Sequence, residues 1–121
     1  MPHLVVEYSD NIVEKPDSKK LLSDLHNILY STGLFRIADM KSRIIVHHDY
    51  LVGDGDPSRA FVTLAISILQ GHGEETKKEL TQKCSALLKE TFEKSFNLLK
   101  LSITVQVKEL DFISYNKESS Y

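Results

Sequence analysis

The second residue of the chain is a proline, and at that position a proline can become a reactive group. A small residue there lets an aminopeptidase remove Met1, which leaves the secondary amine of Pro2 free at the start of a strand. An α-amino group has a pKa of about 7.7–8.0 in peptides, and burial or nearby cations lower it further. Such a group can take a proton from carbon and return it elsewhere. The structural alternative is that proline simply tolerates the first position of a strand, where no ladder hydrogen bond is required.

Three other residues are candidates to hold a negatively charged substrate: Lys41, Arg43 and His72. When a proton leaves carbon next to a carbonyl, charge builds on the oxygen and a cation or donor must stabilise it. Lys41 and Arg43 are two apart on an extended segment, so their side chains share one face. Arg43 could bind a carboxylate through two parallel hydrogen bonds, whereas Lys41 would act as a point charge. Each of the three could equally be a solvated surface residue.

The remaining groups with reactive side chains favour structural roles. Cys84 is the only cysteine, and it falls on the apolar side of a predicted helix, which predicts a buried, unreactive thiol. His47 and His48 are adjacent on a strand and therefore point to opposite faces, which argues against a two-histidine metal site. His3, next to Pro2, could line a pocket or lie on the surface.

The elements that must position these groups alternate between strand and helix. Period-2 apolar runs predict strands and stripes at helical spacing predict helices. Asp17 is placed to cap the first helix and Gly33 to end it, and Glu74 opens the second. The predicted strands are 3–8, 42–48 (running on towards 52), 60–69 and 101–110, and the predicted helices are 17–32 and 74–96.

This order is β-α-β-β-α-β. Each half is a crossover unit, which should be right-handed with its two strands parallel. The turn at 53–57 should join the halves, most simply through antiparallel neighbours. We therefore expect an α+β fold, a four-stranded mixed sheet with two helices on one face, as a single domain over residues 1–121.

One face of the third predicted strand has no partner among these elements. Val62 and its alternate neighbours form the larger apolar face, which the helices should cover, while the opposite face carries Phe61, Thr63, Ala65 and Ser67. That second face is too apolar to be favourable in water across a whole sheet. We expect an oligomer that buries it.

The composition of the chain disfavours two classes of binding partner, nucleic acids and membranes. The chain has 121 residues, 41% of them hydrophobic, and a net charge of −2 with its 15 Lys and Arg residues spread along the sequence. This disfavours a nucleic-acid partner, which would usually meet a basic cluster. No apolar run approaches the roughly 20 residues of a membrane helix, so no membrane partner is expected. The lone cysteine and the missing signal segment favour a reducing, cytoplasmic location.

The opening residues 1–12, Met-Pro-His-Leu-Val-Val-Glu-Tyr-Ser-Asp-Asn-Ile, resemble the start of the 5-carboxymethyl-2-hydroxymuconate Δ-isomerase family of the tautomerase superfamily. The similarity continues through residues 32–35, 42–43, 60–62, 109–110 and 116–117. The resemblance implies a β-α-β-β-α-β homotrimer with active sites near subunit interfaces. It also implies that Pro2 moves a proton between carbons of an unsaturated, dicarboxylate-type keto or enol acid, with no metal or organic cofactor.

The chain departs from this family pattern at two positions, because Lys41 and His72 stand where arginines are expected. Lysine does not bind a carboxylate through two bonds as arginine does, and the charge of a histidine depends on pH near neutrality. Two alternatives therefore stay open. One is a tautomerase for another keto acid, such as an arylpyruvate. The other is a small α+β ligand-binding module without chemistry.

Overall fold

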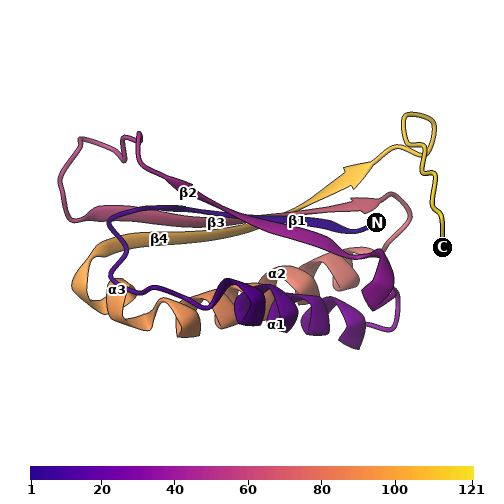
Figure 1. Cartoon of the computed structure of the whole chain (residues 1–121), viewed down its shortest axis with the longest axis horizontal. Helices are drawn as coiled ribbons and strands as arrows, with labels where there is room; N and C mark the ends of the chain where they lie inside the picture. The colour runs from indigo at the N-terminus through magenta and orange to yellow at the C-terminus, as the bar shows by residue number, and fades with distance from the viewer.

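The computed structural model describes residues 1–121 as one four-stranded sheet with helices packed on one of its faces (Figure 1). The elements in chain order are β1 (His3–Ser9), α1 (Ser18–Ser31), a short 3₁₀ helix η1 (Ile37–Asp39), β2 (Lys41–His47), β3 (Arg59–Leu69), α2 (Glu74–Thr91), α3 (Glu93–Leu98) and β4 (Lys100–Leu110). The predicted order of strands and helices is confirmed. None of the helices combines the length and apolar character that crossing a bilayer requires.

The strands lie in the order β2-β1-β3-β4. β1 is parallel to β2, β3 is parallel to β4, and β1 and β3 run antiparallel at the centre. The mixed sheet is thus confirmed, but the expected pairing of the halves through the strands on either side of the 53–57 turn is wrong. The residues between β2 and β3 instead carry the chain past β1, and β2 becomes an edge. Its charged Lys41 and Arg43 suit an edge, where charge discourages pairing with another sheet.

The core lies between the sheet and the helices. Leu4 and Val6 of β1 are fully buried there, together with alternate residues of β3 from Ala60 to Ile68. The helices contribute apolar stripes at helical spacing, Leu21, Leu25 and Leu29 from α1 and Leu80, Cys84 and Leu88 from α2. Burial raises the pKa of the Cys84 thiol to about 12. The prediction of a buried structural cysteine is confirmed.

The helix ends follow the predicted signals, with one exception. Asp17 caps α1 by accepting a hydrogen bond from the Lys20 amide (3.2 Å), and Gly33 follows the helix with a φ of +76°, which glycine adopts without strain. The prediction of a single long second helix over residues 74–96 was wrong. It breaks at the buried Phe92, whose φ of −107° and ψ of 30° leave the helical region, and Phe96 on α3 is 38% exposed rather than in the core.

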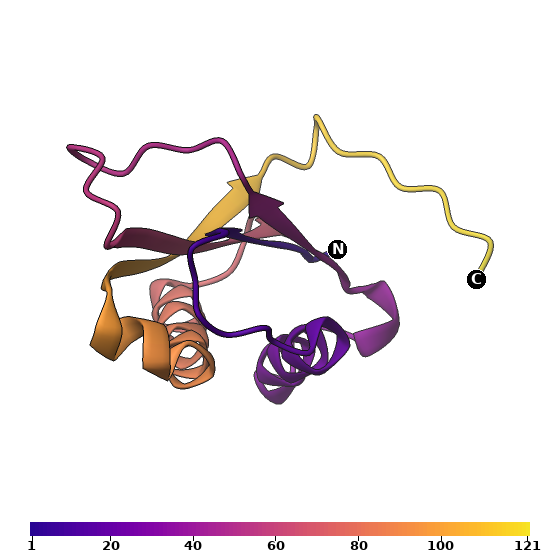
Figure 2. The ribbon, with the colours of Figure 1, turned by 60° about the vertical axis from the view of Figure 1, so that its left-hand side comes forward.

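The second face of the sheet is uncovered in the single chain. Figure 2 shows α1 and α2 on one side of the strands only. Phe61, Thr63, Ala65 and Ser67 alternate with the buried residues of β3 and are partly exposed, and Ile45 of β2 is 42% exposed. Ala65 pairs with Val5 of β1, and Thr63 and Ile45 both pair with Glu7, so these residues form one continuous surface.

Candidate active site

Pro2 lies at the end of the sheet where β1 begins, and its side chain is buried. The Lys41 amide donates to the Pro2 carbonyl across 3.1 Å. His3 pairs with Ser67, so Pro2 is level with Ile68 at the end of β3. The proline nitrogen is joined to Met1 as a tertiary amide in this chain, and it becomes an amine only when Met1 is removed.

The terminal amine of Met1 shows what surroundings the processed amine would meet. Its pKa is lowered from its ordinary value, first by burial and then by the positive charges of Lys117 and Lys41, while Asp39 opposes the shift. Both causes disfavour the ammonium form. Burial and the two lysines therefore favour the neutral form of the Met1 amine.

A pocket of about 290 Å³ opens beside this end of the sheet. His3 and Lys41 line one side of it, and the C-terminal tail, including Tyr115 and Lys117, lines the other. The pKa of His3 is lowered by burial and then by the nearby charges of Arg43 and Lys41. The predicted site residues Lys41 and Arg43 thus lie on the same side of β2, and His3 pairs with Lys41 on the neighbouring strand β1.

His72 lies on the segment between β3 and α2, where its ring packs against Phe35 with centroids 5.2 Å apart. Its charge also acts on Glu109, one of the influences that lower the pKa of that carboxyl, although the ion pair with Lys77 has the larger effect. His72 is therefore near the Pro2 end of the sheet, but it is grouped with Phe35 and Glu109 rather than with Lys41 and Arg43.

The C-terminal tail, residues 111–121, follows β4 and ends on the same side of the molecule as the N-terminus (Figure 1). Lys117 Nζ donates to Asp39 Oδ1 across 3.1 Å, and the Tyr121 hydroxyl donates to the Ala38 carbonyl across 3.2 Å. The residue pattern alone assigned no role to Lys117 or Asp39. The one available signal was the family resemblance at residues 116–117, which marked the position without explaining it.

The adjacent histidines His47, the last residue of β2, and His48, which follows it, have separate partners. His47 Nε2 lies 2.8 Å from Glu7 Oε1, and His48 Nδ1 lies 2.7 Å from Asp10 Oδ2. No group of three or more His, Cys, Asp or Glu side chains is placed to hold a metal ion. Each histidine is therefore accounted for by a carboxylate on or just after β1.

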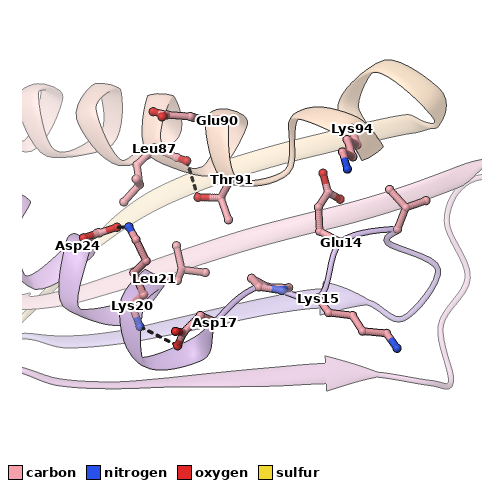
Figure 3. A pocket seen from close by; sticks show the side chains of 12 residues that line it. Glu14, Lys15, Asp17, Lys20, Leu21, Asp24, Leu87, Glu90, Thr91 and Lys94 are labelled. Atoms are coloured by element: carbon pink, nitrogen blue, oxygen red, sulfur yellow. Dashed lines mark hydrogen bonds and ion pairs between the residues drawn. The ribbon is translucent and has the colours of Figure 1, made fainter.

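The largest cavity, about 570 Å³, lies at the other end of the molecule, between the 13–17 loop, α1 and the end of α2 (Figure 3). Some of its charged side chains have partners within the chain. Lys20 Nζ pairs with Asp24 at 2.8 Å, and the Glu14 carboxylate accepts from the amide and hydroxyl of Ser95. Size alone does not make this groove the active site, because it lies at the opposite end of the sheet from Pro2, Lys41 and Arg43.

The sequence was compared with known proteins. Residues 2–120 match the family described as "5-carboxymethyl-2-hydroxymuconate isomerase". A 5-carboxymethyl-2-hydroxymuconate Delta-isomerase of Escherichia coli is 29% identical over 110 residues, covering 91% of this chain and 87% of that protein.

Two solved structures are also similar to this chain. The crystal structure of a 5-carboxymethyl-2-hydroxymuconate isomerase from Deinococcus radiodurans R1 has a TM-score of 0.90 and 30% identity, covering 98% of this chain and 90% of that one. A fused 4-OT wild-type symmetric trimer shares the fold with a TM-score of 0.71 at 14% identity, covering 90% of this chain and 85% of that one. The match across almost the whole chain confirms the resemblance read from the opening residues. The chain belongs to the 5-carboxymethyl-2-hydroxymuconate isomerase family of the tautomerase superfamily and is an isomerase.

Proposed function

We propose that the chain, once Met1 has been removed, uses the Pro2 amine as a general base to move a proton between carbons of an unsaturated keto or enol acid. The observation that carries the proposal is the position of Pro2. It is buried at the start of the sheet, hydrogen-bonded to Lys41, beside a pocket lined by His3, Lys41 and Lys117. A neutral amine there can accept a proton, and the cations there favour an anionic substrate.

The proposed reaction needs no group beyond the chain and its substrate. The Pro2 nitrogen takes a proton from the carbon next to the conjugated system, and the electron pair of that C–H bond moves onto the carbonyl oxygen as a dienolate. Lys41 or Arg43 stabilises the charge on that oxygen. The Pro2 ammonium then returns the proton to a different carbon, so that the double bond shifts and the amine is restored.

The substrate we propose is a polycarboxylate resembling 5-carboxymethyl-2-hydroxymuconate. Lys41 and Arg43 share one face of β2, and Arg43 can hold a carboxylate through two hydrogen bonds. A tautomerase for an arylpyruvate-like monoacid is the second candidate. It is favoured by the placement of His72, which is grouped with Phe35 rather than with the two cations.

The open sheet face supports a homotrimer, which we propose as the working assembly. Its partly exposed apolar and small residues include Phe61 and Ala65 on β3 and Ile45 on β2. A surface of this kind is best buried against further copies. Closed symmetry would leave no face free to add more copies.

The test begins with the intact mass, which reports whether Met1 is absent. The processed protein is then assayed against a dienol tricarboxylate and an arylpyruvate. The matched control carries one alanine inserted before Pro2, which leaves the proline nitrogen an amide after processing. We expect turnover by the processed chain and its near-complete loss in the control. Equal turnover by both proteins would remove the Pro2 amine from the mechanism.

A further inference from the structure

The C-terminal tail brings a lysine to the pocket from the far end of the sequence. Lys117 lies 78 positions from Asp39 along the chain, yet the two side chains form an ion pair at 3.1 Å. Asp39 closes the short helix η1 directly before Met40 and the first residue of β2, Lys41. A chain of contacts therefore runs from Lys117 through Asp39 to the segment that holds the Pro2 carbonyl.

The tail is attached at more than one point, so Lys117 has a defined place. The Tyr121 hydroxyl donates to the Ala38 carbonyl at 3.2 Å, and Lys117 Nζ lies 5.6 Å from the centre of the Tyr121 ring. Arg36 also reaches the Asp39 carboxylate, at 3.3 Å. One carboxylate is thus shared by two cations, Arg36 and Lys117.

The pocket itself has a cationic character. Of its lining residues, Lys41 and Lys117 are positively charged, and His3, a register partner of Lys41, also lines the pocket. Lys41 Nζ donates to the Asp39 main-chain carbonyl rather than to a carboxylate. The one acidic residue in the lining, Glu118, is exposed and forms no ion pair. An ammonium has three donors, so Lys117 can bind a second anion while it keeps Asp39.

We propose that Lys117 is a substrate-binding residue, and that the tail, held by Asp39, presents it with Lys41 as a two-lysine site for a second carboxylate of the substrate, distinct from the one held by Arg43. This inference rests on the proposed function, since it concerns the same pocket. It implies that the pocket binds a polycarboxylate. This holds even though Lys41 stands where the family resemblance leads us to expect an arginine. Asp39 is a positioning residue, because it acts through Lys117.

Binding of unreactive acids tests the proposal without requiring turnover. Calorimetric titration of the processed protein with propane-1,2,3-tricarboxylate and with butanoate separates recognition of a second carboxylate from recognition of one. We expect Lys117→Met to weaken tricarboxylate binding by about tenfold, within the range for hydrogen bonds to charged groups, and butanoate binding by less than about twofold. Lys117→Arg should keep most of the tricarboxylate affinity.

Lys100→Met is the matched control. It removes a lysine that pairs with Asp56 at 3.7 Å, at the start of β4 and far from Pro2, and it should leave both affinities unchanged. Asp39→Asn should weaken tricarboxylate binding less than Lys117→Met does, since the lysine remains but its anchor is weaker. Thermal denaturation of each variant verifies folding.

The proposal is overturned if Lys117→Met leaves tricarboxylate affinity unchanged, if it weakens both acids equally, or if the unmodified chain binds the two acids equally well. None of these outcomes bears on Pro2, because dienol turnover by the processed chain and by the alanine-insertion control is measured separately. Loss of turnover with intact tricarboxylate binding would count against the Pro2 mechanism and would leave the role of Lys117 standing.

Discussion

The amide of Lys41 donates to the carbonyl of Pro2 across 3.1 Å, so the first residue of β2 and the residue before β1 are held side by side. This bond places a lysine next to the N-terminal proline whatever conformation the lysine side chain adopts. We therefore expect the Pro2 amine, once Met1 is removed, to lie near the main chain of Lys41. The predictions below depend on that arrangement.

Replacing Pro2 by Ala should keep the fold and lose much of the proton-transfer rate. A positioned base typically contributes about 10²–10⁴-fold, and alanine provides a primary amine without the fixed ring. Turnover is measured on protein whose mass shows that Met1 is absent. An unchanged rate in that material would contradict the role of Pro2.

The pH profile of kcat/KM should report the terminal amine. A base acts when it is unprotonated, so activity should rise with pH through the pKa of the amine and then level off. Burial, Lys117 and Lys41 lower the pKa of the chain's terminal amine. Lys41→Met removes one of these positive charges, so it should raise the pKa and move the rise in activity to higher pH. A rise that stays at the same pH would show that Lys41 does not act on the base.

Arg43→Lys keeps the charge but loses the pair of parallel hydrogen bonds. We expect a loss of roughly 1.5–3 kcal/mol in substrate binding, seen mainly as a raised KM. Arg59→Lys is the control, because Arg59 pairs with Asp54 at 2.8 Å at the opposite end of the sheet. Equal effects of the two substitutions would show that Arg43 makes no specific contact with the substrate.

Ala65→Arg places a charge in the middle of the open sheet face and should dissociate the proposed trimer. Gln82→Arg, on an exposed position of α2, should leave assembly unchanged. Sedimentation at micromolar concentration distinguishes the two. A monomer in the unsubstituted protein would contradict the proposed assembly.

Cys84 should react with a thiol reagent only when the chain unfolds. Its side chain is fully buried, and burial raises its pKa to about 12, so almost no thiolate forms at neutral pH. The labelling rate in native conditions should therefore follow the unfolding equilibrium. Rapid labelling of the folded protein would contradict the packing of α2 on the sheet.

The residue pattern was enough to predict the elements, because their signals are local. Alternation along residues 60–69 and the stripe of α1 each depend on neighbours within two turns or a few strand positions. The Asp17 cap and the Gly33 end of α1 are equally local. The same patterns also separated the buried face of β3 from its open face. Pro2 was singled out as the catalytic candidate by the family resemblance rather than by these patterns.

Strand order and the composition of the pocket required the tertiary structure. Sequence order favours pairing β2 with β3, yet burial on the helix side is complete for β1 and β3 and not for β2, which places β2 at the edge. Lys117 reaches Asp39 only because β4 and the tail end beside the start of β1. No local spacing encodes a contact between residues so far apart, since the geometry of the whole sheet decides where the tail lies.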